Sequence, residues 1–325
     1  MNKVLIFTIC SNNYLPQALV LAKSVEKYVP ESSFVIGLVD SISSEIDYSK
    51  IPGKILPIAE VGIDKKFDNI DQYNIVELNT AVKGFLFQHF LHTFPDVEYV
   101  YYFDPDMCLF HSIKCLEDAL CERQIVLTPH ILTPLPDDGK HPLPMAFLSF
   151  GLYNFGFVGI RRGPVANAFV DWFASMLGKY CFDNRERGLF VDQLWGNYVP
   201  VFWDEQTLLI RHPGCNMAYW NFHERRLSVE PNGSARYVVN DKYPLVFFHF
   251  SNYRPFDEAP FTRYQTRFDY KSRPIECKLY EEYKKELLIP EYKKWKAVPC
   301  VYKQKQKTFR QKLLQKCITF LKRYE

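Results

Sequence analysis

The sequence predicts an α/β protein with a mostly parallel central sheet flanked by helices and with a helical, basic C-terminal extension. Three observations indicate this fold: an opening strand, helix and strand, a later strand that is apolar at every position, and a lysine-rich end with helical spacing. The chain has 325 residues, 47% hydrophobic and 16% aromatic. It is therefore long enough, and apolar enough, to bury a large core.

The chain opens with a strand, a helix and a second strand. Residues 4–10, VLIFTIC, are rich in β-branched and aromatic side chains and predict a strand. Residues 14–28 have apolar side chains at helical spacing and predict a helix that ends at Pro30. Residues 33–39 predict the second strand. This arrangement is typical of parallel sheets with helices on their faces.

The later elements follow the same pattern. Residues 99–103, YVYYF, predict a central strand that is buried on both faces. The proline-rich residues 130–144 predict a loop. We further expect helices over residues 74–94 and 165–180, and strands over residues 124–128, 155–160 and 244–250. The chain is thus expected to form one domain over residues 1–270, followed by a helical extension over residues 271–325.

Two aspartates follow the apolar strand directly, in the sequence FDPDMCLF. Because ligands of open parallel sheets bind beyond the carboxyl ends of the strands, Asp104 and Asp106 are candidate site residues. Pro105 restricts the backbone between them, so both carboxylates can point to one place. Paired oxygen donors of this kind suit Mg²⁺ or Mn²⁺. The alternative is an ordinary surface turn, since Asp-Pro dipeptides favour turns.

A second group of polar residues follows another predicted strand, where residues 247–255 read FFHFSNYRP. His249 is a candidate third metal ligand, and Arg254 is a candidate partner for diphosphate oxygens. The alternative for His249 is a partly buried histidine with satisfied hydrogen bonds. We expect the parallel-sheet topology to bring His249 near Asp104 and Asp106.

Together these motifs resemble the glycosyltransferase A fold and, within it, nucleotide-sugar transferases similar to glycosyltransferase family 8, which includes glycogenin and lipooligosaccharide galactosyltransferases. The resemblance covers roughly residues 3–256. FDPDMCLF matches the family's Asp-x-Asp motif, YNFGFVGI its Asn-x-Gly strand and VDQLWGN its Asp-Gln segment. FTICSNNYLPQALVLAKSV is similar to its first strand and nucleotide-binding turn. HFSNYRP resembles its His-x-x-Gly-x-x-Lys-Pro motif, although Asn252 and Arg254 replace the glycine and lysine.

The resemblance implies a metal-dependent transferase that moves a hexose-type sugar from a nucleoside diphosphate sugar, with uridine expected, to a glycan or lipid-linked acceptor. It implies retention of anomeric configuration and a role in surface polysaccharide synthesis. Mn²⁺ or Mg²⁺ would be held by Asp104, Asp106 and His249. The implied donor contacts are Thr8, Ile9, Tyr14, Asp104, Asn154, Gly156 and Arg254, and the implied catalytic residues are Asp192, Gln193 and Lys83.

Two of these expectations have a simpler alternative. Lys83 lies in ELNTAVKGFLFQHFL, where the family carries a basic residue near the donor, but a solvated helix lysine would give the same pattern. Trp220 and Asn221 belong to an aromatic stretch that could stack on an acceptor sugar, whereas tryptophans of such a fold are more often part of the core.

The charge is concentrated at the C-terminal end. Residues 303–325 carry a charge of +7 and the remaining chain −4, so the body has no basic surface expected to bind nucleic acid. Residues 303–323, KQKQKTFRQKLLQKCITFLKR, predict a basic amphipathic helix that binds an anionic membrane, or else packs its apolar stripe on the domain. Nine cysteines without a CxxC pair favour a reducing compartment. We expect a cytoplasmic protein, peripheral at the inner face of the membrane.

Two other functions compete with sugar transfer. A non-catalytic protein of the same fold would bind nucleotide sugars or glycans without turnover. A sugar nucleotidyltransferase would make the nucleotide sugar, but such enzymes usually open with a glycine-rich phosphate loop, and residues 8–15 contain no glycine.

Overall fold

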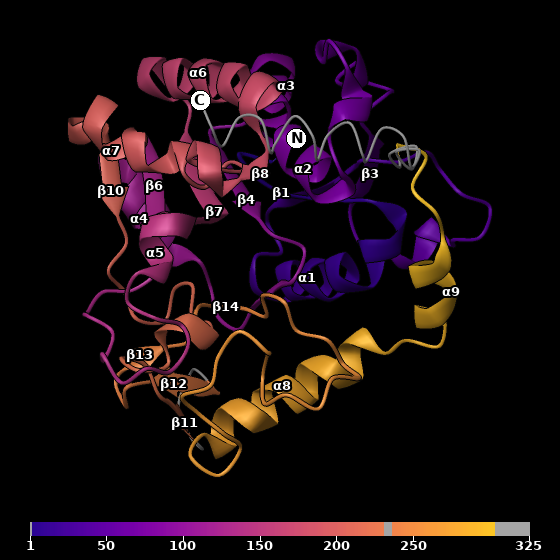
Figure 1. Ribbon diagram of the computed structural model, residues 1–325. Coiled ribbons are helices and arrows are strands. Elements are labelled where there is room, and N and C mark those ends of the chain that lie inside the picture. The colour runs from indigo at the N-terminus through magenta and orange to yellow at the C-terminus, as the bar shows by residue number, and fades with distance from the viewer. Residues whose placement is uncertain (1, 231–235, 303–325) are drawn as a thin grey trace, which may run out of the picture.

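The computed structural model describes residues 2–230 and 236–302. Its centre is a seven-stranded sheet in the order β10-β6-β7-β4-β1-β2-β3 (Figure 1). Strand β7 is antiparallel to its neighbours β4 and β6, and the other pairs are parallel. The predicted, mostly parallel sheet is confirmed. Its strands are β1 (Val4–Cys10), β2 (Ser33–Leu38), β3 (Lys54–Pro57), β4 (Tyr99–Phe103), β6 (Ile125–Pro129), β7 (Tyr153–Arg161) and β10 (Thr207–Leu209).

Helices cover both faces of this sheet, as Figure 1 shows for α3 and α6 on one side and α1 on the other. Strand β1 explains why both layers form, because its side chains alternate between two apolar cores. Leu5 and Phe7 pack toward α2 (Ile75–Ala81), α3 (Lys83–Thr93) and α6 (Pro164–Tyr180). Ile6 packs toward α1 (Leu15–Tyr28) and α4 (Lys114–Glu122). Burial on both faces gives the continuous apolar runs of β1 and β4.

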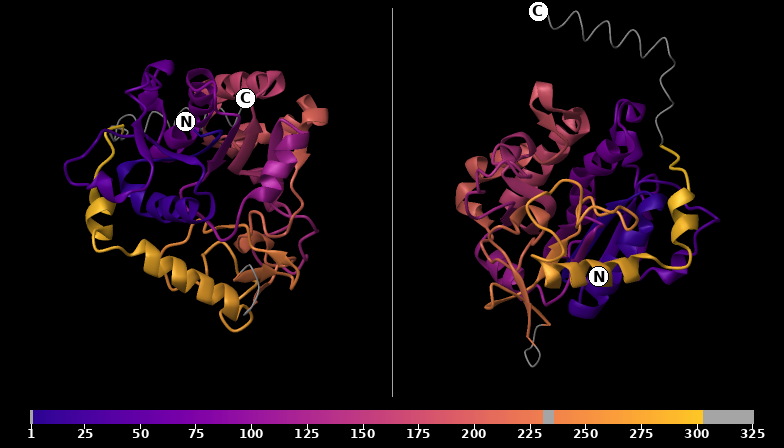
Figure 2. Two further views of the ribbon diagram at one scale, coloured as in Figure 1. Left: turned by 180° about the vertical axis from the view of Figure 1, so that it is seen from behind. Right: turned by 60° about the horizontal axis from the view of Figure 1, so that its bottom comes forward.

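The C-terminal part of the described chain wraps along α1. Figure 2 shows α8 (Pro274–Leu287) and α9 (Tyr292–Ala297) passing along one side of the molecule. Tyr280 and Tyr283 of α8 share a core cluster with Val20 of α1. The expected boundary at residue 270 stays a prediction, and the expected basic helix at residues 303–323 lies outside the described residues.

The remaining elements are short. Two small sheets pair β5 (Met107–Leu109) with β14 (Phe247–His249) and β8 (Asp183–Asn184) with β9 (Leu189–Phe190), and a three-stranded sheet contains β11 (Leu227–Val229), β12 (Tyr237–Val239) and β13 (Tyr243–Pro244). The short helices are α5 (Ala146–Phe150) and α7 (Val199–Phe202). Within residues 2–230 and 236–302, no helix combines the length and apolarity needed to span a bilayer.

Two predicted elements are divided in the structure. The helix expected over residues 74–94 is interrupted at Val82, whose ψ of −12° departs from regular helical backbone, so α3 starts anew at Lys83. The strand expected over residues 244–250 forms parts of two different small sheets, in β13 and β14. The apolar side chains of residues 244–250 correctly indicate that the segment is buried, but they do not show which sheet it joins.

The contact between α3 and α6 is close enough to require glycine at position 84. A Cβ atom there would lie 2.6 Å from the Cα of Ala174. We expect Gly84→Ala to destabilise the protein by about 1–3 kcal/mol, because overpacking against backbone outweighs the gain in helix propensity. Gly178→Ala is the control, since its Cβ would meet only the ring of Phe85, at 3.0 Å. Urea unfolding measures both; equal midpoints would contradict this reading of the contact.

Candidate metal and donor site

The turn after β4 places two carboxylates at the end of a buried strand. The N–H of Asp104 donates to the carbonyl of Gly156 at 2.7 Å, which ties the turn to β7. The carbonyl of Asp104 accepts from the N–H of Met107 at 3.0 Å, so the chain turns around Pro105. The carbonyl of Asp106 accepts from the N–H of Phe250 at 2.9 Å. The segment is thus a turn, which agrees with the alternative of an ordinary Asp-Pro turn. Its two carboxylates also form a cluster with His249.

His249 completes that cluster. Its Nε2 lies 3.1 Å from Oδ1 of Asp106 and 3.8 Å from Oδ2 of Asp104. One ligand atom from each of the three residues lies within 4.8 Å of the others. His249 lies near Asp104 and Asp106, as expected. The prediction that the parallel central sheet brings it there is wrong. His249 ends β14, which pairs antiparallel with β5, immediately after Asp106, and not with the central sheet.

Asn154 orients the imidazole. Its Oδ1 accepts a hydrogen bond from Nδ1 of His249 at 3.2 Å. With the proton on Nδ1, the lone pair of Nε2 can face the two carboxylates. Burial lowers the pKa of His249, but Asp106 and Asp104 raise it by more, so the pKa lies above its ordinary value. A cation between the carboxylates would replace the extra proton of the imidazolium.

The cluster fits a divalent cation chemically and sterically. Two carboxylates and one imidazole form a donor set suited to Mn²⁺ or Mg²⁺, and a second residue orients the imidazole, as is usual for metal ligands. The space also depends on Gly156. A Cβ there would lie 2.7 Å from Oδ2 of Asp104 and 2.9 Å from Cε1 of His249. Gly156, expected to border the donor sugar, lies directly against the cluster.

Tyr102 supports the cluster from within β4, and the sequence analysis missed it. Its hydroxyl donates to Oδ1 of Asp104. Burial and the neighbouring Asp104 raise the pKa of Tyr102 well above its ordinary value, so the hydroxyl remains a donor. The ammonium of Lys83 lies over the same ring, 4.1 Å from its centroid. Tyr102 therefore joins the candidate metal ligands to the next group of charges.

Lys83 is buried and paired, so it is not the solvated helix lysine of the simpler alternative. It donates to Oδ2 of Asp192 and, at 2.8 Å, to the carbonyl of Phe155. Burial raises the pKa of Asp192, and Lys83 opposes that shift. Gln193 lies beside this pair. Its Nε2 donates to the carbonyl of Phe150 at 2.7 Å, and its Oε1 accepts from Nδ2 of Asn154 at 3.3 Å.

The expected nucleotide-binding stretch reaches the cluster through Tyr14. Its hydroxyl donates to Oδ2 of Asp106 at 3.5 Å, and the ammonium of Lys296 lies over its ring. Thr8 and Ile9 are buried within β1, and the hydroxyl of Thr8 has no hydrogen-bond partner in the described part of the chain.

A polar network that the sequence did not predict lies beside that stretch. Asn12 donates through its N–H to Asp40 at 3.2 Å and accepts from the hydroxyl of Tyr48 at 2.6 Å. Asp40 also accepts from the N–H of Val301 at 3.0 Å, so the end of the described chain is attached here. Isolated polar residues at a strand end gave no signal that these segments meet.

The remaining expected residues lie apart from the cluster or beneath it. Arg254 is exposed, and within the described ranges its side chain has no ion pair. Trp220 is 5% exposed and its ring stands edge-on to His249, 5.2 Å between centroids. Asn221 is fully buried and bonds to backbone groups of His130, Asn216 and Ala218. These positions favour the core alternative for the aromatic stretch.

Comparisons with known proteins show what this chain is similar to in sequence and in fold. No family model matches the chain. It is 24% identical to the uncharacterized protein YfnF of Bacillus subtilis strain 168 over 250 residues, 76% of this chain and 80% of YfnF. It is 27% identical to the uncharacterized YfnD of the same strain over 191 residues, 56% of this chain and 55% of YfnD.

Among solved structures, the chain is similar to the galactosyltransferase LgtC, crystallised with donor and acceptor sugar analogs. The TM-score is 0.52 at 15% identity, and the match covers 90% of this chain and 99% of LgtC. The chain therefore has the glycosyltransferase A fold, as the sequence predicted.

The buried Lys83–Asp192 pair provides a test of the site's electrostatics. Lys83→Met leaves a buried carboxylate without its partner, and we expect a loss of about 3–5 kcal/mol in the free energy of unfolding. Adding Asp192→Asn should recover part of that loss, because the uncompensated charge is removed. Lys114→Met, which breaks an exposed ion pair with Asp118, is the control and should change little. Denaturant unfolding measures all three; a Lys83→Met variant as stable as the parent would refute the pairing.

Proposed function

We propose that the protein is a metal-dependent glycosyltransferase that moves a hexose-type sugar from a uridine diphosphate sugar to a glycan or lipid-linked acceptor, with retention. The observation that carries this proposal is the convergence of Asp104, Asp106 and His249, oriented by Asn154, at the carboxyl end of β4. The similarity in fold to LgtC supports it. Surface polysaccharide synthesis is the proposed setting.

The departing diphosphate needs neutralisation and a fixed position. A divalent cation bound here would supply positive charge to the phosphate oxygens that become more negative as the sugar leaves. Asp104 and Asp106 would hold that cation. Tyr102 fixes the rotamer of Asp104 by its hydrogen bond, and Tyr14 does the same for Asp106. Both carboxylates are therefore oriented before a donor binds.

The sugar would lie on the side of the cluster where Asp192 and Gln193 are found. Lys83 bonds to one oxygen of Asp192, and we propose that the other oxygen accepts from a donor-sugar hydroxyl. Lys83 would also add positive charge behind the leaving group. Gln193 is held from both ends, by Phe150 and Asn154, so it can present a fixed dipole to the reacting face.

The nucleotide would lie over the turn that follows β1. Tyr14 offers an aromatic ring beside the cluster, and Thr8 and Ile9 lie near the carboxyl end of β1, a few residues earlier in the chain. Arg254 would reach the diphosphate only if its exposed side chain turned toward the site. We propose it as a donor contact because it is a flexible cation five residues after His249.

Substitution of a proposed ligand tests the reaction. We expect Asp106→Asn to lower donor turnover at least about 100-fold, because a bound metal stabilises developing charge by several kcal/mol. The Mn²⁺-dependent rise in melting temperature should disappear in the same variant. Asp118→Asn, an exposed aspartate on α4, is the matched control.

Removal of divalent cations by a chelator should abolish turnover by the parent protein. The remaining low turnover of Asp106→Asn should not increase when the chelator is added. Turnover that is undiminished by both Asp106→Asn and chelator would refute the metal-dependent mechanism. Metal and donor binding with neither transfer nor slow donor hydrolysis would instead support the non-catalytic alternative.

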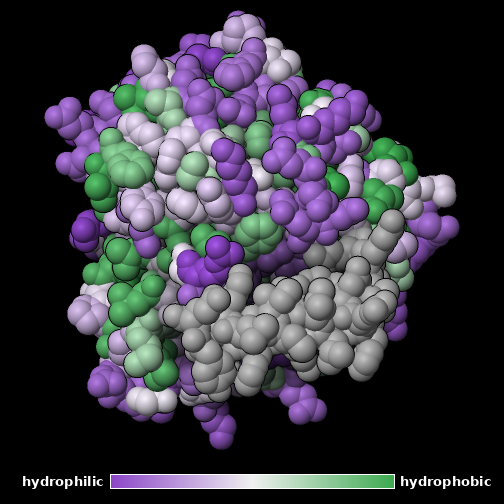
Figure 3. Space-filling view, turned by 45° about the horizontal axis from the view of Figure 1, so that its top comes forward, coloured by the Kyte–Doolittle hydropathy of each residue, from purple (hydrophilic) through white to green (hydrophobic). Residues whose placement is uncertain are grey.

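An exposed apolar surface beside Gln193 supports an acceptor with an apolar portion and a location at the membrane. We call it the α5–α7 surface. Figure 3 shows hydrophobic side chains gathered on the side where Figure 1 labels α5 and α7. Leu148 is 78% and Val201 73% exposed, values that favour contact with an apolar partner. The surface comprises Met145, Leu148, Leu152, Tyr198, Val201 and Phe202.

Vesicle binding tests this location. We expect the full chain to co-sediment with vesicles that contain anionic lipid, and Leu148→Ser with Val201→Ser to reduce the bound fraction several-fold. Val76→Ser with Phe256→Ser is the control, because these apolar residues are similarly exposed but lie elsewhere. A chain that ends at Tyr302, and so keeps the bond between Val301 and Asp40, separates the contribution of the basic end. Equal sedimentation of all four proteins would contradict both membrane contacts.

A further inference from the structure

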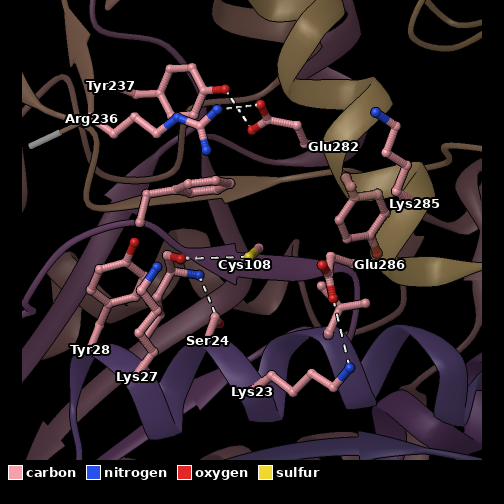
Figure 4. A pocket seen from close by; sticks show the side chains of 14 residues that line it. Lys23, Ser24, Lys27, Tyr28, Cys108, Arg236, Tyr237, Glu282, Lys285 and Glu286 are labelled. Carbon is pink, nitrogen blue, oxygen red and sulfur yellow. Dashed lines mark hydrogen bonds and ion pairs between the residues drawn. The ribbon is translucent and has the colours of Figure 1, made fainter. Parts of the chain in front are cut away.

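A pocket lies between α1, β5, β12 and α8. Its volume is about 460 Å³, within the usual size of small-molecule sites. Figure 4 shows basic and acidic side chains from three of these elements facing one another across it. None of Asp104, Asp106 and His249 lines it. The lining residues used below are Lys23, Lys27, Tyr28, Phe110, Arg236, Tyr237, Glu282, Lys285 and Glu286.

The two acidic side chains of the pocket are already paired. Arg236 forms an ion pair with Oε1 of Glu282, and the hydroxyl of Tyr237 donates to Oε2 of the same carboxylate at 2.7 Å. Lys23 lies 3.7 Å from Glu286. Figure 4 shows both pairs as contacts to α8 from opposite walls. They connect α8 to α1 and to the start of β12.

Two cations remain beyond these pairs. Within the described ranges, Lys27 and Lys285 form no ion pair with a carboxylate, although Lys27 lies 4.8 Å from the ring centroid of Tyr28. Among the described residues, four basic and two acidic side chains line the pocket, which gives these lining residues a net charge of +2. Lysine binds phosphate as a compact point charge without a demand for planar geometry. The pocket is thus complementary to an anion such as a phosphate group.

The floor of the same pocket is apolar and aromatic. Phe110 packs edge-on against Tyr237, with 5.8 Å between ring centroids. Tyr283 is 4% exposed and stacks on Phe250 at 3.7 Å, so the floor is fixed by the core. Its buried hydroxyl has no hydrogen-bond partner in the described part of the chain. A flat, apolar group would contact these rings while an attached anion met the lysines.

We propose that this pocket binds a phosphate group attached to a flat or apolar body. The phosphate meets one of the two unpaired lysines, Lys27 on the α1 wall or Lys285 on the α8 wall, and the apolar body lies on Phe110 and Tyr237. Two sources share this chemistry: a soluble phosphate ester and the headgroup region of a phospholipid. The proposal is independent of the sugar-transfer reaction, because it concerns a different set of residues.

Calorimetric titration of the full-length protein with 1-naphthyl phosphate, without metal or donor, tests the proposal. We expect saturable binding that exceeds the affinity for 1-naphthol and for inorganic phosphate, since each of these offers half of the interactions. Lys27→Gln with Lys285→Gln should weaken the affinity for 1-naphthyl phosphate about tenfold or more. Lys65→Gln with Lys66→Gln is the control, because it removes the same charge from a surface outside the pocket.

Absence of binding at millimolar probe, or equal affinity of the two double variants, would overturn the proposal. A competition with vesicles then identifies the source of the phosphate. Displacement of bound 1-naphthyl phosphate by phosphatidylglycerol vesicles, but not by phosphatidylcholine vesicles, supports a lipid headgroup. Binding that anionic vesicles leave unchanged supports a soluble phosphate ester. Neither arm depends on turnover, so failure of the transferase proposal would not affect the result.

Discussion

Repulsion between two carboxylates at the end of a buried strand is the constraint on which the candidate site depends. Asp104 and Asp106 are held together by neighbours that each satisfy part of their charge: Tyr102, Tyr14 and the imidazole of His249. The raised pKa of His249 expresses the same constraint, because the extra proton of its imidazolium supplies positive charge beside the two carboxylates. An arrangement in which two carboxylates and an oriented imidazole favour positive charge at one place is suited to hold a cation there.

A second, buried charge pair extends this organisation toward the proposed sugar position. The ammonium of Lys83 connects Asp192 to the ring of Tyr102, whose hydroxyl reaches Asp104. A substitution at any of these positions changes the field at the others, because a buried network has little water to screen it. The break between α2 and α3 contributes here, since it places Lys83 at the start of a helix that packs tightly on α6 through Gly84.

Much of the fold could be predicted from the sequence, at the places where the spacing of apolar residues matches the burial of the strand or helix. Strand β4 is apolar throughout, and β1 at every position except Thr8, because helices cover both faces; α1 and α6 follow the helical period of their apolar side chains. The Asp-Pro-Asp turn was visible for its carboxylates. Tyr102 was not, because an aromatic residue in an apolar run resembles core until its hydroxyl partner is known.

The segment of residues 244–250 was misread for a related reason. An apolar run reports burial and says nothing about which strand will pair with it. Pro244 at its start pairs with β12, whereas Phe247–His249 pair with β5. His130 was missed likewise. It lies beside Asn154 and Trp220, and burial lowers its pKa to about 3, but nothing near it in sequence indicates that position.

The short ladder between β5 and β14 sets the position of the third metal ligand, and its register is fixed by aromatic packing on both sides. Phe247 faces the central sheet, where it contacts Phe103 and Phe157 at 5.2 and 5.1 Å between centroids. Phe248 faces the other way, onto Tyr280 of α8 at 5.5 Å. Side chains of a strand alternate, so His249 must share the face of Phe247.

A slip of one residue would reverse every one of these directions. Phe248 would then meet the central sheet, and His249 would turn away from Asp104 and Asp106. Three paired residues contribute few backbone hydrogen bonds, so the two aromatic clusters are what exclude the alternative register. The arrangement of the candidate metal site thus rests on phenylalanines that never contact the ion, and on a helix, α8, that lies beyond the glycosyltransferase motifs in the chain.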